Sequence, residues 1–184
     1  MWHDARSHRR NCQGGGRGEA ARPNPEQAHH ASGRPRAIRG GNVTQTQVRS
    51  GDLFVFYGLL KQGAAGQPAD LPLSTAGAFG APCRFRGRMV DLGGFPGVVD
   101  GDQLCYGIRW QLNDPAIMPA MDAFEDVTDD PETSLYLRTR VPLCDDAGNE
   151  TGELAWIYWY NKSIEGFQAV ADGNWPLDAG KTRK

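Results

Sequence analysis

The order of hydrophobic and polar residues predicts several short strands. Residues 53–57, Leu-Phe-Val-Phe-Tyr, form a continuous apolar run that ends at Gly58, which is typical of a strand buried on both faces. Glycine-punctuated apolar segments follow within residues 85–99, and we expect Asp100 and Gly101 to form a hairpin turn after them.

Three later segments alternate in the way that strands do. In residues 103–112 we expect one face to be buried, formed by Leu104, Tyr106, Ile108, Trp110 and Leu112. In residues 135–143 the apolar face consists of Leu135, Leu137, Val141 and Leu143, and the other face carries Tyr136, Arg138 and Arg140. Residues 153–161 are apolar on both faces, with Trp156, Tyr158 and Tyr160 on one and Ala155, Ile157 and Trp159 on the other.

One helix is well signalled, because Asp114 is a suitable N-cap and a proline follows it at the first helical position. Apolar residues then recur at the spacing of one helical stripe, at Ile117, Ala120, Met121 and Phe124. Glu125 lies four residues beyond Met121, so its carboxylate shares an edge of that stripe and could point into the protein. Six or seven mostly hairpin-connected strands with one principal helix favour an α+β domain, in which an antiparallel sheet curls towards a barrel beneath the helix.

Charge divides the chain near residue 50. The first 50 residues hold nine arginines and three acidic residues, a net charge of +6, whereas the remainder holds 11 basic and 19 acidic residues, a net charge of -8. The first part is also rich in glycine and proline and has few aliphatic residues, so it cannot bury enough surface to offset the entropy cost of ordering. We therefore expect a disordered extension at 1–50, a folded domain at 51–165 and a polar C-terminal tail at 166–184.

Three interpretations of the extension remain open. Its arginines could attract nucleic acid through phosphate, but no interleaved aromatic residues or binding motif accompany them, so the sequence does not favour a nucleic-acid partner. A processed organellar targeting peptide would also be rich in arginine, although glycine and proline disrupt the amphipathic helix that it needs. The third interpretation is a dispensable extension that results from a start codon assigned too far upstream.

Histidine and cysteine usage limits the chemistry of the predicted domain. All four histidines lie within the first 30 residues, so the later residues cannot build a Ser-His-Asp or Cys-His pair, nor an HExxH or other His-ligated metal site. Acid–base catalysis would fall to carboxylates, tyrosine, lysine or cysteine.

The four cysteines are widely spaced, which favours free, buried thiols and a cytoplasmic location. No apolar run reaches the roughly 18 residues of a membrane span, and no secretory signal is evident, so we expect no membrane partner.

Two glycine-containing turns, at residues 58–61 and 93–97, are candidates for ligand binding. Glycine lets a backbone approach a ligand closely and leaves N–H groups available to an anion. Glycine is also ordinary in turns, so each turn taken alone is more simply interpreted as structural. Neither segment matches a phosphate-binding loop, so the sequence does not support nucleotide binding.

Glu125 has two interpretations. It is either a solvated residue at the end of a helix or a carboxylate that the neighbouring Met121 shields from water for proton transfer, with Asp122 as its local competitor. The strand tyrosines are likewise either packing aromatics or ligand-binding residues. They are Tyr57, Tyr136 and Tyr158.

Five motifs, in their order along the chain, resemble those of the γ-glutamylcyclotransferase superfamily. They lie at residues 57–60 (YGLL), 91–97 (DLGGFPG), 121–125 (MDAFE), 136–141 (YLRTRV) and 155–161 (AWIYWYN). The resemblance spans about residues 52–162. It implies a small mixed, mainly antiparallel β-barrel with a central cavity and one principal helix, which works without a metal or another cofactor.

The resemblance also implies a reaction on a small-molecule partner. A γ-glutamyl-amine or γ-glutamyl-amino-acid substrate would release 5-oxoproline and a free amine by intramolecular attack, with Glu125 as the general acid and base. The remaining site residues implied by the resemblance hold the substrate or line the cavity: Tyr57, Gly58, Leu59, Leu60, Gly93, Gly94, Tyr136 and Tyr158.

Two residues depart from the pattern of the superfamily. Leu59 stands where serine or threonine is common, and Ile108 stands where glutamate often follows a glycine. These departures keep an alternative open, a non-catalytic small-molecule-binding or regulatory module of the same fold.

Overall fold

The computed structural model describes residues 47–179, and the expectations for the first 46 residues and the last five lie outside this part of the chain. Its strands are β1 (Leu53–Phe56), β2 (Gly77–Asp91), β3 (Pro96–Leu112), β4 (Tyr136–Cys144), β5 (Glu150–Tyr160) and β6 (Gln168–Ala169). Its helices are the short α1 (Leu73–Ala76), the 3₁₀ turn η1 (Pro115–Ile117) and α2 (Met118–Phe124).

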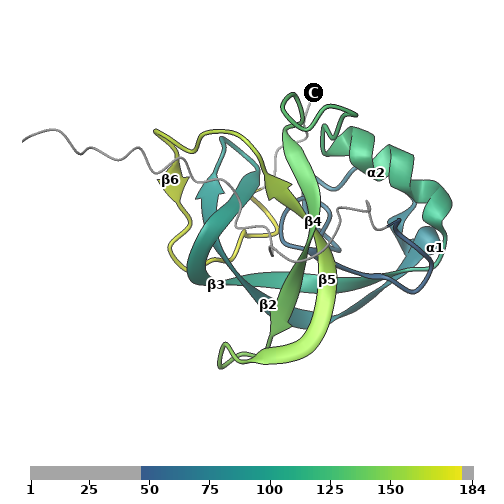
Figure 1. Cartoon of the computed structure of the whole chain (residues 1–184), viewed down its shortest axis with the longest axis horizontal. Helices are drawn as coiled ribbons and strands as arrows, with labels where there is room; N and C mark the ends of the chain where they lie inside the picture. Colours follow the sequence, from purple (N-terminus) through teal and green to yellow (C-terminus); the bar gives the residue numbers. More distant parts are fainter. Residues whose placement is uncertain (1–46, 180–184) are drawn as a thin grey trace, which may run out of the picture. The chain divides into compact units, whose positions relative to one another are not determined.

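The strands form one sheet in the order β3-β1-β5-β4-β2-β6, and a further pairing of β2 with β3 brings its two sides together. Neighbouring strands are antiparallel, except that β1 and β5 run parallel where Phe54 pairs with Trp156. β2 and β4 meet at one residue pair, Arg84 with Cys144, so the barrel is only roughly closed. The predicted α+β fold, a mixed and mainly antiparallel barrel with one principal helix, is confirmed. In the view of Figure 1, that helix, α2, lies at the right of the domain, and the last strand of the sheet, β6, lies at the left.

Alternate residues of the central strands supply two hydrophobic clusters, because the sheet is covered on both faces. Phe54 and Phe56 enter the first cluster, which also holds Trp110 and residues of α2, whereas Val55 enters the second. The faces of β5 divide as its sequence predicts: Trp156, Tyr158 and Tyr160 join the first cluster, and Ala155, Ile157 and Trp159 join the second.

The hairpin turn expected at Asp100 and Gly101 is wrong, since both residues lie within the continuous strand β3. The register of β2 with β3 shifts there, so that the extra residues of β3 form a bulge. The actual turn between the two strands lies at residues 92–95, where the Leu92 N–H donates to the Phe95 carbonyl oxygen at 2.9 Å. The side chain of Asp91 closes this turn by accepting from two backbone N–H groups, and this contact is invisible to a composition rule.

The expected half-burial of β3 holds only near its end. Trp110 and Leu112 are buried, but Cys105 and Gly107 are more buried than the alternate residues Leu104, Tyr106 and Ile108, which remain partly exposed. The reason is that Cys105 packs in the second cluster, while the Val55 side chain of the paired strand β1 lies so close to Gly107 that a Cβ there would be 2.3 Å from its Cγ2 atom. The alternation of apolar and polar residues along a strand defines two faces, but it does not show which face other parts of the protein will bury.

The predicted helix begins as expected, with the Asp114 carboxylate accepting a hydrogen bond from the Ala116 N–H at 3.0 Å. Its buried stripe differs at one position, because Ala120 is exposed and Met118 is buried. The first helical residues form the 3₁₀ turn η1, which has about 3.0 residues per turn and therefore shifts the stripe relative to an ideal α-helix. The buried face of α2 consequently runs through Met118, Met121 and Glu125.

The end of α2 fixes the position of Glu125. Asp126 has φ +51°, the left-handed conformation that ends many helices and that aspartate tolerates better than most residues. The Asp126 N–H donates to the Ala123 carbonyl oxygen at 3.2 Å, and the Val127 N–H donates to that of Asp122 at 2.9 Å. These two bonds form a Schellman motif, so the helix stops with Glu125 as its C-cap residue.

The residues after 165, for which the composition predicts a polar tail, pack in part against the domain. β6 pairs with β2, and Trp175 is buried in the second cluster. The ammonium of Lys61, a residue only 1 % exposed, donates a hydrogen bond to the Trp175 carbonyl oxygen and lies 5.5 Å from the centre of the Tyr106 ring. Lys61 therefore connects this C-terminal segment to the turn that follows β1.

Replacing this buried lysine should change how stability depends on pH. Burial lowers the pKa of Lys61 from 10.5 to about 8, although Asp172 partly opposes the shift. Between about pH 8 and 10.5 the unfolded chain therefore binds more protons at this residue, so its contribution to stability rises with pH and is least favourable below pH 8. Urea unfolding should show that the free energy of unfolding of wild type rises relative to that of Lys61→Met between pH 7 and 10. The relative increase should be on the order of 2–3 kcal/mol over this range. Groups that titrate in both proteins contribute equally and do not affect the difference between them. A difference in unfolding free energy that stays constant with pH would contradict the prediction.

Candidate active site

A small pocket, partly open to solvent, lies where β1 ends. The turn after β1, the β2–β3 turn, the end of α2 and strands β4 and β5 all contribute to its wall. The lining residues are Val55, Phe56, Tyr57, Gly58, Leu59, Leu60, Phe95, Pro96, Glu125, Tyr136 and Tyr158. Residues far apart in the sequence thus come together in one small, mainly apolar space.

Glu125 is the acidic residue among those lining residues, and it is only 8 % exposed. A solvated position at the helix end is therefore excluded. Its competitor Asp122 does not line the cavity, and its carboxylate instead forms an ion pair at 2.5 Å with Arg138 of β4. The structure thus places the predicted residue Glu125 in the cavity wall and its competitor Asp122 outside the lining.

Three residues of the turn after β1 line the cavity: Gly58, Leu59 and Leu60. It is closed by the Lys61 N–H, which donates to the Gly58 carbonyl oxygen at 3.1 Å. A Cβ on Gly58 would lie 2.8 Å from Cγ of Pro96, so only glycine lets these two parts of the wall approach so closely.

The second predicted glycine turn takes a different role. Gly93 and Gly94 do not line the cavity, because their N–H groups donate to the Asp91 carboxylate at 2.8 and 3.1 Å and thereby stabilise the turn. The next two residues, Phe95 and Pro96, line it instead, and sequence reasoning missed both. They belong to the same DLGGFPG motif, so the motif identified the segment but not the side of the turn that faces the cavity.

All three predicted tyrosines line the cavity and donate their hydroxyl protons to acceptors of the protein itself. Tyr57 donates to the Tyr158 carbonyl oxygen at 2.7 Å, and Tyr136 donates to the Pro96 carbonyl oxygen at 2.8 Å. Tyr158 donates to Asp122 at 2.8 Å. These bonds fix the orientation of each ring, which a sequence pattern cannot specify.

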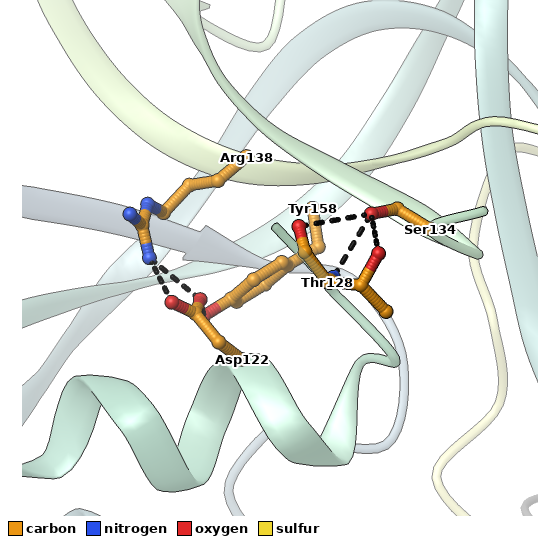
Figure 2. A network of polar contacts seen from close by, with 5 residues as sticks. All are labelled: Asp122, Thr128, Ser134, Arg138 and Tyr158. Atoms are coloured by element: carbon orange, nitrogen blue, oxygen red, sulfur yellow. Dashed lines mark hydrogen bonds and ion pairs between the residues drawn. The ribbon is translucent and has the colours of Figure 1, made fainter. Parts of the chain in front are cut away.

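Figure 2 shows how the Tyr158 hydroxyl and Arg138 converge on Asp122. Burial, and then the nearby negative charge of Asp122, raise the pKa of Tyr158 well above its ordinary value, and Glu125 acts in the same direction. The hydroxyl of Tyr158 therefore keeps its proton at every physiological pH. A second group in the same view ties the following acidic loop together, where the Thr128 N–H donates to the Ser134 hydroxyl at 2.9 Å.

The other reactive groups of the described chain lie away from this cavity. Cys83, Cys105 and Cys144 are free and buried, and burial raises the pKa of Cys83 and Cys105 to about 11, which keeps both thiols protonated. Among residues 47–179, no group of three or more histidine, cysteine or acidic side chains is placed to hold a metal ion. None of the helices in that range combines the length and apolar character needed to cross a bilayer.

Several solved structures resemble this fold, all at low sequence identity. The c4763 protein of uropathogenic Escherichia coli aligns with a TM-score of 0.50 and 18% identity, over 69% of this chain and 94% of that one. The ytfP protein of Escherichia coli aligns with a TM-score of 0.46 and 22% identity, over 67% and 95%. A gamma-glutamyl cyclotransferase aligns with a TM-score of 0.46 and 14% identity, over 65% and 70%. In sequence, no curated protein matches the chain.

A family model supplies the assignment that these distant structures cannot. The model described as gamma-glutamyl cyclotransferase, AIG2-like, matches residues 53–177, which is more than half of the chain. The match begins with β1 and extends past β6 and the buried Trp175. The chain therefore belongs to the gamma-glutamyl cyclotransferase, AIG2-like family.

Proposed function

We propose that the protein is a γ-glutamyl cyclotransferase that converts a γ-glutamyl-amine or γ-glutamyl-amino-acid into 5-oxoproline and a free amine. The observation that carries the proposal is the position of Glu125, a nearly buried carboxylate in the wall of a cavity that residues 58–60 also line. Family membership supports the same reaction class.

The reaction needs no second substrate, because nucleophile and electrophile belong to the same molecule. The α-amine nitrogen of the γ-glutamyl group attacks the side-chain carbonyl carbon, and a C–N bond forms that closes a five-membered lactam. Glu125 accepts a proton from the attacking nitrogen and donates it to the leaving nitrogen as the original C–N bond breaks. The carboxylate thus ends in its initial state, and no water is consumed.

The turn after β1 is the proposed site for the negative charges of the substrate. In this proposal, backbone N–H groups of residues 58–60 bind the α-carboxylate and stabilise the developing oxyanion. Leu59 cannot supply the hydroxyl contact that serine or threonine would add, but the backbone groups do not depend on that side chain. Tyr136 and Tyr158 then close the cavity around the glutamyl group.

The proposal is tested by incubating the purified protein with a panel of γ-glutamyl-amines and γ-glutamyl-amino-acids and measuring 5-oxoproline by mass spectrometry. We expect at least one member to release equal amounts of 5-oxoproline and free amine. If members of the panel bind, as measured by calorimetry, yet none is converted, the protein is a binding module of the same fold and the proposal is wrong.

A further inference from the structure

The polar side chains that line the cavity can accept hydrogen bonds from a ligand. A tyrosine hydroxyl has a single proton, and Tyr57, Tyr136 and Tyr158 each give theirs to an acceptor within the protein. Towards a ligand, their oxygens can then only accept. The Glu125 carboxylate is also an acceptor when ionised, so the side chains of this cavity are matched to a ligand that donates.

For Tyr158, the group that accepts the hydroxyl proton does not line the cavity. Its partner Asp122 does not line the cavity and is held by Arg138, whose guanidinium contacts both carboxylate oxygens at 2.5 and 2.6 Å. The Asp122 carboxylate accepts from the guanidinium and from the tyrosine, so the shared proton is that of the Tyr158 hydroxyl. The raised pKa of Tyr158 agrees, because it keeps the hydroxyl protonated. Tyr158 and Glu125 both line the cavity.

We propose that Asp122 is a positioning residue that holds Tyr158 as a hydrogen-bond acceptor for the α-amino group of the ligand, beside Glu125. This inference rests on the proposed function, since it concerns the nucleophile of that reaction. The chemical reason is that an attacking amine must keep its lone pair available. A hydroxyl that accepts an N–H turns the lone pair away from itself, whereas one that donates would occupy the lone pair and block the attack.

The same arrangement should distinguish substrate from product. A γ-glutamyl substrate brings an ammonium group with three N–H donors and a positive charge, whereas the lactam of 5-oxoproline has one neutral N–H. Hydrogen bonds that involve a charged group are stronger than neutral ones, so cyclisation itself weakens binding and favours release. The ligand class is therefore defined by a free primary ammonium group.

Two ligands that differ only in this group provide the test: γ-glutamylethylamide and its analogue without the α-amine. Affinities are measured by NMR titration on the full chain, and the same spectra record any 5-oxoproline. Turnover and binding are thus read separately, so failure of the proposed reaction is distinguishable from failure of this inference. We expect wild type to bind the ligand that carries the amine about tenfold or more tightly than its analogue.

Two substitutions test the hydroxyl of Tyr158 in different ways: one removes its oxygen, and the other changes it from an acceptor to a donor towards the cavity. Tyr158→Phe removes the oxygen and should reduce the preference for the amine severalfold. In Asp122→Asn the amide carbonyl faces Arg138, so its NH₂ donates to Tyr158 and turns the hydroxyl proton towards the cavity. Asp122→Asn should therefore abolish the preference and lower kcat more than Tyr158→Phe does, while affinity for the analogue without the amine stays unchanged. The control Asp146→Asn removes an exposed ion pair with Arg84, 2.9 Å in length, and should alter neither ligand.

Three results would overturn the inference. The first is an Asp122→Asn variant that keeps the wild-type ratio of the two affinities. The second is an equal loss for both ligands, which would mean that Asp122 only maintains the fold. The third is a wild-type protein that binds neither ligand or binds both equally.

Discussion

Glu125→Gln is expected to lose 5-oxoproline release while the protein remains folded. Glutamine preserves the size of the side chain at the end of α2 but cannot accept and return a proton at neutral pH, and general acid–base catalysis contributes about 10²–10⁴ to a rate. We therefore expect kcat to fall at least about a hundredfold with a small change in KM. Steady-state assays of 5-oxoproline, together with circular dichroism and thermal unfolding, measure both parts of the prediction.

The matched control is Glu150→Gln, which makes the same chemical change at an exposed residue that does not line the cavity. This variant should keep wild-type kinetics. A Glu125→Gln protein that turns over at the wild-type rate would show that another group transfers the proton. A variant that unfolds would be replaced by Glu125→Asp, which retains the carboxylate and should recover part of the activity.

Gly58→Ala is expected to impair both stability and catalysis. The added methyl group would lie 2.8 Å from Cγ and 3.1 Å from Cδ of Pro96, closer than carbon atoms tolerate, and a proline ring cannot rotate away. The two walls of the cavity must therefore move apart, and overpacking of this kind costs about 1–3 kcal/mol. Because the same turn is proposed to bind the substrate carboxylate, a shift of even about 1 Å should lower kcat/KM roughly a hundredfold.

Gly80→Ala is the control for this substitution. A Cβ at Gly80 would meet its nearest atom, Cβ of Arg109, at 3.4 Å, which is ordinary contact, and Gly80 is outside the cavity. Chemical denaturation and kinetics of both variants should show a small effect for Gly80→Ala and a large one for Gly58→Ala. Equal effects would mean that the close approach to Pro96 does not constrain the turn.

Features that depend on residues near one another in the sequence could be predicted, whereas features that depend on distant residues could not. The two faces of β5 and the Asp114 cap of the helix follow from neighbours in the sequence, and both predictions are confirmed. The hairpin at Asp100 failed because the pairing of β3 with β2 continues past that residue. The motif around Gly93 identified the correct turn, yet the Asp91 side chain uses its N–H groups and leaves the next two residues to line the cavity.

The sequence by itself determined the inventory of the domain. Local periodicity indicated most of the strands and the helix, and the absence of histidine from residue 31 onward left acid–base catalysis to carboxylates, tyrosine, lysine or cysteine. Only the tertiary structure decided which carboxylate lies in the wall of the cavity. Asp122 and Glu125 differ by less than one helical turn, but Arg138 on β4 lies within reach of the first and the cavity opens to the second. Ion pairing, burial and the direction of a shared proton depend on groups brought together across the barrel, and no local pattern in the chain contains that information.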